Sequence, residues 1–269
     1  DSKPEIDYGK LEETVNLAVR FLDNVIDMNR FPLPEIAQKT KQTRKIGLGV
    51  MGFADMLLKL GIPYDSAAAL EVAEKTMEFV NRKACEASVA LAAERGVFPA
   101  FAGSVYDVPD GPRMRNATTT TIAPTGSLSI IANCSSGIEP LFALSYERHI
   151  LDGDELVEVN PYFEEAARRG GFFSDELMKD LARRGSLRGM DGIPEQVKRL
   201  FVTAHDISPE WHIKMQAAFQ KSTHNAVSKT INFPHSATRD DVAEAYNLAY
   251  DLGCKGITIY RDRSKDKQV

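Results

Sequence analysis

The residues whose types and spacing could do chemistry are concentrated in 122–140, IAPTGSLSIIANCSSGIEP. The β-branched run ATTTTI at 117–122 predicts a strand, and 126–132 predict a short helix. A strand that passes through Gly126 into a helix leaves backbone N–H groups unpaired at the positive end of the helix dipole. Such a corner binds anions, and hydroxyl donors are supplied by Thr125, Ser127 and Ser129. A phosphate group is therefore one ligand that the pattern indicates.

A plainer interpretation of the same corner stays open. Thr125 or Ser127 could simply cap the short helix, with Pro124 fixing the entry of the chain. No Lys follows Gly126, so the pattern disfavours a P-loop NTPase.

A second glycine pattern, Gly47-Leu48-Gly49-Val50-Met51-Gly52, matches the dinucleotide-binding string GxGxxG. That string binds a pyrophosphate only when it follows a strand, with an acidic residue about 20 positions later. Here the preceding residues are QKTKQTRK, and no acidic residue closes a second strand at that distance. We predict instead a helix over 46–60 whose glycines allow close packing.

Cysteines and histidines give no sign of a metal or redox site in this segment. The three cysteines, Cys85, Cys134 and Cys254, are too widely spaced for a CxxC motif or a disulfide framework, and each is predicted to pack. None of the five histidines has zinc-site spacing. For His224, capping or a surface position is favoured over a substrate contact. No catalytic residue and no metal ligand is predicted here.

The elements that must position the corner alternate along the chain. Helices are predicted over 10–29, from the Ser66 cap to Gly96, over 161–169, 174–184 and 194–204, and from a Ser208 cap with Pro209 as first helical residue. Two strands are predicted within 143–159, joined at 152–154.

The last part of the chain reads as strand, helix and strand, over 228–233, 238–252 and 255–260. A crossover of that length makes the two strands parallel. The class is therefore α/β, and residues 1–269 are predicted to form a single domain.

Composition excludes several classes of function. A net charge of −5 and scattered basic residues argue against nucleic-acid binding. No apolar run approaches the roughly 20 residues that cross a bilayer, and no signal peptide is present, so no membrane partner and a cytoplasmic location are expected.

The chain starts with Asp and ends on a polar run, so a piece of a longer protein is expected.

Several long segments resemble the large subunits of ribonucleotide reductases, most closely the adenosylcobalamin-dependent class II enzymes. The central match is MRNATTTTIAPTGSLSIIANCSSGIEPLFALSYER. Further matches, in the right order along the chain, are AVRFLDNVIDMNRFP, RKIGLGVMGFADMLLKLGIPYDS, NAVSKTINFP and GCKGITIYRDRS. The likeness covers essentially the whole chain.

The resemblance implies a fold and a site. The fold is the ten-stranded α/β barrel of the ribonucleotide reductase and glycyl-radical type, of which this chain carries most of the second half. The site is the loop that holds the phosphates of the substrate, matched here by Pro124, Thr125, Gly126, Ser127 and Leu128.

The family replaces the ribose 2′-hydroxyl by hydrogen with a cysteine thiyl radical. It carries that cysteine in an Asn-x-Cys-x-Glu loop, and no such string occurs here; Asn133-Cys134 lacks the Glu. The resemblance thus implies that the N-terminal half with the catalytic cysteines is absent, and that the fragment alone is inactive. It also implies a ribonucleotide diphosphate or triphosphate as substrate, adenosylcobalamin as cofactor, a thioredoxin-like reductant and a homo-oligomer.

Two alternatives stay open. One is half of a split enzyme that acts as a barrel-completing interaction module, because half a barrel exposes strand edges and apolar surface. The other is a class I large-subunit relative, in which a Tyr-Tyr pair on the last strand relays a radical. Thr258 and Ile259 stand at about that place, and Tyr260 has no second tyrosine next to it in the sequence, which favours class II.

Overall fold

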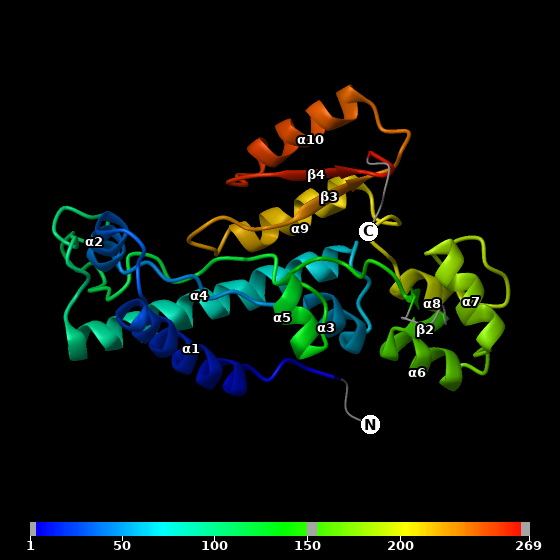
Figure 1. Cartoon of the computed structure of the whole chain (residues 1–269), viewed down its shortest axis with the longest axis horizontal. Coiled ribbons are helices and arrows are strands. Elements are labelled where there is room, and N and C mark those ends of the chain that lie inside the picture. Colours follow the sequence, from blue (N-terminus) through cyan, green and yellow to red (C-terminus); the bar gives the residue numbers. More distant parts are fainter. Residues whose placement is uncertain (1–3, 150–154, 265–269) are drawn as a thin grey trace.

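The computed structural model describes residues 4–149 and 155–264 and places helices around adjacent extended segments (Figure 1). The first part of the chain forms α1 (Tyr8–Met28), α2 (Pro34–Thr43), α3 (Phe53–Leu60), α4 (Ala67–Arg95) and α5 (Gly126–Ala132). The middle part forms β1 (Ser145–His149), β2 (Glu155–Val159), α6 (Pro161–Arg169), α7 (Asp175–Arg184) and α8 (Glu195–Leu200). The last part forms α9 (Pro209–Gln220), β3 (Thr230–Phe233), α10 (Arg239–Asp251) and β4 (Thr258–Arg261).

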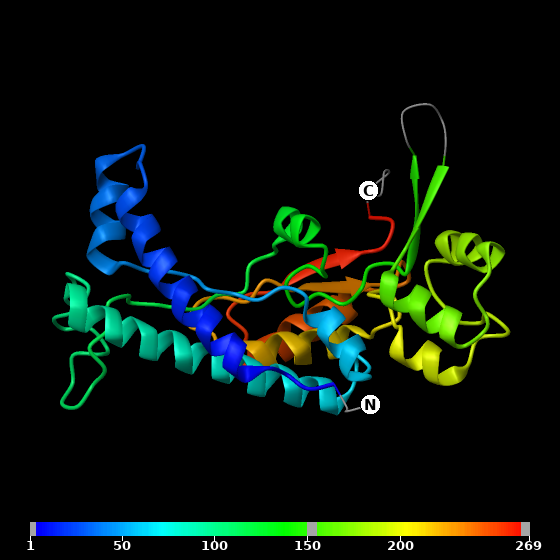
Figure 2. The same cartoon turned by 90° about the horizontal axis from the view of Figure 1, so that it is seen from below.

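Helix α4 begins and ends where the sequence predicts. The Ser66 hydroxyl accepts a hydrogen bond from the Ala69 N–H at 3.2 Å, and Gly96 follows the last turn. Helix α1 confirms the helix predicted over 10–29 and packs across α4 (Figure 2). Residues from these two helices and α3 build much of the main hydrophobic core. Within the described ranges, no helix has the length and apolar character needed to span a bilayer.

The helix predicted over 46–60 is wrong for its first part. Helix α3 begins only at Phe53, whereas 46–50 are extended and pair with 118–121. The cause is a close backbone approach: a Cβ on Gly49 would lie 2.4 Å from the carbonyl oxygen of Thr121. The glycines therefore do allow close packing, but between extended segments rather than between helices.

Four adjacent extended segments run parallel. Leu48 bridges Thr120, Ile122 bridges Val227, and β3 pairs with β4 from Thr230–Thr258 to Phe233–Arg261, all in parallel. The predicted parallel pair at the end of the chain is confirmed. The run 117–122 is extended as predicted, although it makes single bridges to its two neighbours rather than a regular strand. Parallel neighbours joined through helices are the arrangement that an α/β barrel requires.

Helices α9 and α10 cover these strands. Helix α9 contacts both α4 and β3, and α10 contacts α9 (Figure 1). Pro209 is the first residue of α9, as predicted, but the hydroxyl of Ser208 makes no capping bond, so that part of the prediction is wrong. Thr238 caps α10 through a reciprocal capping box with Asp241.

The middle part of the chain forms a hairpin packed on helices. Strands β1 and β2 are antiparallel, which confirms two strands within 143–159; the predicted joint at 152–154 lies outside the described residues. Helices α6 and α7 match their predicted ranges, whereas α8 ends at Leu200, earlier than the predicted 204. Helix α7 contacts β1. Ion pairs on exposed faces of this part, such as Glu164–Arg168, agree with solvated helix surfaces.

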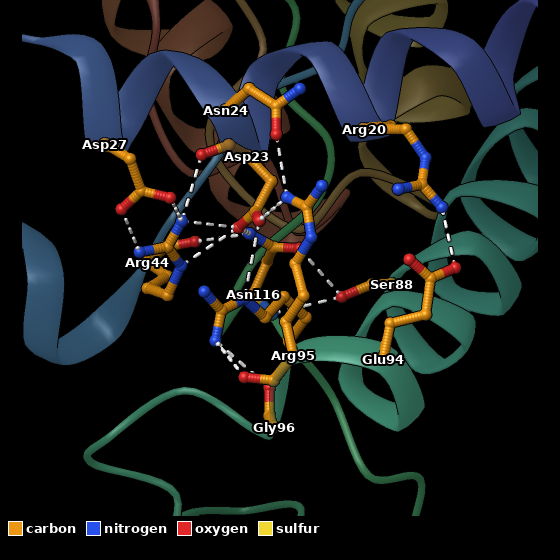
Figure 3. A network of polar contacts seen from close by, with 11 residues as sticks. Arg20, Asp23, Asn24, Asp27, Arg44, Ser88, Glu94, Arg95, Gly96 and Asn116 are labelled. Carbon is orange, nitrogen blue, oxygen red and sulfur yellow. Dashed lines mark hydrogen bonds and ion pairs between the residues drawn. The ribbon is translucent and has the colours of Figure 1, made fainter.

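A buried ionic network joins α1, α2, α4 and the segment before the 117–122 run (Figure 3). Its centre is the Asp23 carboxylate, whose side chain is 0% exposed. One oxygen accepts bonds from Arg44 at 2.9 Å and Asn116 at 3.0 Å; the other contacts Arg95 at 3.0 Å and Arg115 at 3.4 Å. Because Asn116 lies one residue before the extended run, the network anchors the start of that run against α1.

The network keeps its central carboxylate charged despite its burial. Burial opposes ionisation of Asp23, yet hydrogen bonds from Arg44 and Asn116 hold the pKa of this carboxyl below its usual value. The Asn116 side chain also donates to the carbonyl of Arg44 at 2.9 Å and accepts from Ser88 at 3.0 Å. Each group in the centre therefore has a partner, and loss of one member leaves others buried and unpaired.

Asp23→Ala is expected to lower the free energy of unfolding by about 3–5 kcal/mol, because it leaves buried cations without their counter-charge. Glu71→Ala is the matched control on α4, since the Glu71–Lys75 pair is 65% and 64% exposed. The control is expected to cost no more than about 0.5 kcal/mol. Denaturant titration of both variants measures the difference, and equal midpoints would contradict the assigned role of Asp23.

Candidate functional site

The corner between the extended run and α5 is held by a loop that follows α5. Thr125 has a left-handed backbone with φ 55° and precedes the first residue of α5. Its hydroxyl oxygen accepts a hydrogen bond from the Gly137 N–H at 2.8 Å, and the Ser136 hydroxyl donates to the Pro124 carbonyl. The corner is thus braced by 136–137, which the sequence did not indicate.

The hydroxyl groups of the corner do not make the helix-capping bonds that the sequence suggested. Neither Thr125 nor Ser127 caps α5, since the helix has no side-chain capping bond. Thr125 is occupied by Gly137, and the Ser129 hydroxyl donates to the Gly126 carbonyl at 2.9 Å. The Ser129 hydroxyl is therefore not a free donor, and the prediction that it supplies one is wrong, whereas the Thr125 hydroxyl accepts from Gly137 and keeps its own proton. Ser127 is exposed.

The backbone donors of the corner are free. Among the described residues, the N–H groups of Gly126, Ser127 and Leu128 make no hydrogen bond. The first N–H group of α5 that does donate is that of Ser129, to the Thr125 carbonyl at 2.8 Å. All three residues are exposed, and a Cβ placed on Gly126 would meet no atom within 4 Å. Three unpaired N–H donors at the start of a helix, with open space next to Gly126, can bind an anion.

A cleft of about 1020 Å³ opens beside the corner. The corner and the loop after α5 form one side of it, and strands β3 and β4 form another. The third side comes from the segments that flank the hairpin and its helices. The lining residues that matter here are Pro124, Gly126, Ser136, Glu139, Phe142, Ala204, His205, Thr230, Asn232, Ile259 and Tyr260. The volume is sufficient for a nucleotide-sized ligand.

Helix α3 holds the loop after α5 from behind. The carboxylate of Asp55, in the first turn of α3, accepts a hydrogen bond from the Ser135 N–H at 2.6 Å. The Gly52 N–H donates to the Ser135 carbonyl at 2.7 Å. Ser135 lines the cleft, so α3 sets the position of this wall. Sequence reasoning missed Asp55 because its partner lies 80 residues away.

A second buried ionic cluster forms the wall between the loop and β3. The Lys229 side chain is 0% exposed, and its Nζ lies 2.5 Å from Glu139 Oε2 and 2.9 Å from His212 Nδ1. Glu139 Oε1 accepts a bond from the Thr230 N–H at 2.7 Å. Burial lowers the pKa of Lys229, while Glu139 opposes that change. Sequence reasoning did not single out any member of this cluster.

His212 is held in its neutral form. Burial lowers its pKa to about 3, and the charge of Lys229 acts in the same direction. Because Nδ1 faces the Lys229 ammonium, Nε2 carries the proton and donates to the Ala204 carbonyl at 3.0 Å. The ring is thus a neutral bridge between Lys229 and the cleft residue Ala204.

The cysteines lie among packing residues. Cys134 lies beside Gly52, behind the corner, and Cys254 packs on the small core of α10 and the strands. Cys85 is on α4, with its Sγ 3.9 Å from His224 Nε2. Burial raises the pKa of all three thiols. A raised pKa disfavours the thiolate, the reactive form.

His224 supports the backbone of the extended run. Its Nδ1 accepts a hydrogen bond from the Thr119 N–H at 3.1 Å, and burial lowers its pKa. Over the described ranges, no group of three or more His, Cys, Asp or Glu side chains is arranged to hold a metal ion.

Comparison with known proteins decides the family. The family model described as "Ribonucleotide reductase, barrel domain" matches residues 1–110 and 111–260. The chain belongs to the ribonucleotide reductase barrel family. The resemblance stated from the sequence is confirmed, and so is the fold class, part of an α/β barrel.

Individual relatives agree with this family. The chain is 59% identical over 265 residues to the vitamin B12-dependent ribonucleoside-diphosphate reductase of Thermoplasma acidophilum, covering 98% of this chain and 34% of the relative. It is 49% identical to the reductase of the same description from Mycobacterium tuberculosis, covering 98% and 38%. This reductase domain therefore spans about a third of the length of these curated relatives.

A solved structure supports the same fold. The alpha subunit of the Actinobacillus ureae class Id ribonucleotide reductase superposes with a TM-score of 0.82 at 25% identity. The match covers 93% of this reductase domain and 46% of that chain. The parallel segments of this chain are therefore arranged as in a reductase alpha subunit.

The buried His212 makes the stability of the reductase domain dependent on pH. The unfolded chain binds a proton near the ordinary pKa of 6.5, whereas folded His212 does not until about pH 3. Stability from this group is therefore complete above pH 6.5 and is lost as the pH falls toward 3. The His212→Gln variant is expected to lose stability less steeply than wild type between pH 7 and 4, measured by denaturant titration. His235→Gln, at an exposed histidine, is the control; a wild-type slope in His212→Gln would refute the assignment.

Proposed function

We propose that this chain is part of a ribonucleotide reductase that makes deoxyribonucleotides, and that it holds the phosphates of the ribonucleotide substrate. The residues proposed for the phosphates are Pro124, Thr125, Gly126, Ser127 and Leu128. The observation that carries the proposal is the set of three unpaired N–H groups at Gly126–Leu128, the first of which belongs to a residue that lines a nucleotide-sized cleft. Residues 126–128 donate through the backbone, while Thr125 holds the corner in shape through Gly137.

The chemical step is proposed to need parts of the reductase outside this chain. The Asn-x-Cys-x-Glu string that carries the radical cysteine in the family does not occur in these residues. Exposed apolar residues beside the corner support a covering partner segment: Ile130 and Ile131 on α5 are 80% and 82% exposed. We infer that the N-terminal half of the reductase covers them, that a thioredoxin-like dithiol reduces the enzyme, and that the complete protein is a cytoplasmic homo-oligomer.

Adenosylcobalamin is the proposed cofactor. The two relatives above carry vitamin B12 dependence in their names. The cofactor combines apolar ring faces with amide side chains, and the cleft offers both kinds of surface, apolar at Phe142 and Ile259 and polar at Asn232. When bound, the cofactor would supply the radical that the reaction requires. The residues of this chain would orient the substrate beside it and exclude water.

A class I reductase is the second candidate. The chain is 33% identical over 298 residues to a ribonucleoside-diphosphate reductase subunit alpha of Chlamydia pneumoniae. On β4, however, Thr258 and Ile259 precede Tyr260, so the chain lacks an adjacent tyrosine pair there. Activity of the complete protein that depends on added adenosylcobalamin would favour class II, and activity that depends on a second radical-generating subunit would favour class I.

An interaction module of a split enzyme remains the third candidate. The exposed apolar face of α5 supports it as well as it supports the reductase assignment, because both need a partner segment. Because both bind the N-terminal half, nucleotide binding by the completed assembly separates them: Gly126→Val is expected to weaken it only if this chain itself holds the substrate.

Gly126→Val tests the phosphate site. A Cβ on Gly126 would meet no protein atom within 4 Å, so the fold is expected to persist while the added bulk stands beside the free N–H groups. In the complete reductase we expect the KM for the nucleotide to rise about tenfold or more, equivalent to about 1.4 kcal/mol of lost binding. Gly256→Val is the matched control, because a Cβ there also meets nothing within 4 Å.

Thermal unfolding of both variants checks that the fold is retained. Unchanged nucleotide affinity in Gly126→Val, with Gly256→Val behaving as wild type, would rule out the corner as the phosphate site.

A further inference from the structure

Glu139 places a negative charge in the wall of the cleft that is proposed to receive phosphates. Its side chain is 26% exposed and lines the same cleft as Gly126. An unpaired carboxylate there would repel an anionic ligand through a medium less polar than water. The repulsion would act directly against the donors of the corner, so the charge needs a counter-charge close by.

Lys229 supplies that counter-charge from behind the wall. Its ammonium is fully buried, 2.5 Å from Glu139 Oε2, and also donates to the Thr230 carbonyl at 2.5 Å. Since the lysine side chain is 0% exposed and does not line the cleft, it does not itself contact a ligand there. Its effect on the cleft must pass through Glu139.

The contacts around the ion pair also fix the shape of the wall. Glu139 Oε1 accepts from the Thr230 N–H, which ties the loop after α5 to β3. His212 bridges Lys229 to the Ala204 carbonyl, and the Ala204 N–H donates to the Leu141 carbonyl at 2.8 Å. These contacts therefore connect Lys229 to Leu141, which lies in the same loop two residues after Glu139. Glu139, Leu141, Ala204 and Thr230 all line the cleft.

We propose that Lys229 is a positioning residue of the substrate cleft, which cancels the charge of Glu139 and holds it against β3 so that phosphates meet a neutral wall. This inference rests on the proposed phosphate site. Stability alone does not explain the pair, because apolar residues of similar volume usually stabilise a buried position as well as an ion pair does. The partial exposure of Glu139 to the cleft is what gives the pair a consequence for binding.

Three variants of the complete reductase test the proposal. Lys229→Met leaves the Glu139 charge uncompensated, so the KM for the nucleotide is expected to rise about tenfold or more, with kcat changed less than about threefold. The double variant Lys229→Met/Glu139→Gln removes both charges and is expected to regain a KM within about threefold of wild type. Lys221→Met, which breaks the exposed Lys221–Glu74 pair, is the control and is expected to match wild type.

The single variant Glu139→Gln keeps the proposal testable if Lys229→Met does not fold. It removes the negative charge from the wall, so its KM is expected to stay within about threefold of wild type or to fall. A rise of about tenfold in Glu139→Gln would overturn the proposal. So would an unchanged KM in a folded Lys229→Met variant, or a double variant that binds as weakly as Lys229→Met.

Failure of this inference and failure of the proposed function give different results. If Gly126→Val weakens nucleotide binding but Lys229→Met does not, only the role of Lys229 is wrong. If neither variant changes nucleotide binding, the phosphate site itself is wrong. Thermal unfolding midpoints of every variant separate loss of binding from loss of fold.

Discussion

The close approach of residues 46–50 to the extended run before the corner is the constraint on which the site depends. A Cβ on Gly47 would lie 2.6 Å from Thr121 Cγ2, and one on Gly49 would lie 2.4 Å from the Thr121 carbonyl oxygen. Real side chains do not tolerate such distances, so only glycine lets the two backbones pair here. The pairing sets where α3 begins, and α3 then holds the loop after α5 through Asp55 and Ser135. The position of the cleft wall therefore depends on two glycines, Gly47 and Gly49, that lie far from it in sequence.

Elements whose signals are local could be predicted from the sequence. Helix α4 has its cap at Ser66 and its stop at Gly96 within its own segment, and the crossover through α10 made β3 and β4 parallel by its length alone. The helix predicted over 46–60 is wrong for 46–52, because the glycines there make a contact with residues more than 70 positions away. Helical propensity and pattern carry no information on such a contact.

For the candidate site, the sequence predicted the free backbone N–H groups but not the contacts of the side chains. A strand-to-helix corner with Gly126 was readable, because the free N–H groups follow from any helix start. The side chains were not readable: Thr125 is paired with Gly137, 12 residues on, and Glu139 with Lys229, 90 residues on. Such pairs need the tertiary fold to bring them together, and a single sequence gives no sign of them. The likeness to reductases supplied the ligand class that the backbone pattern had left open.

The two buried ionic clusters differ in what they face, and this difference separates a structural role from a functional one. Asp23 on α1 is fully buried, with partners at the end of α2, on α4 and in the segment before the 117–122 run, so its charge acts only within the core. Glu139 is also held by a buried cation, Lys229, but is partly exposed to the cleft, so a change in its charge acts on a ligand there. Removing a partner from the first cluster therefore acts on folding, whereas removing one from the second also changes the electrostatic potential in the cleft. The potential is decisive in a site whose donors are backbone dipoles, because such donors contribute less than full charges and are readily outweighed by one carboxylate.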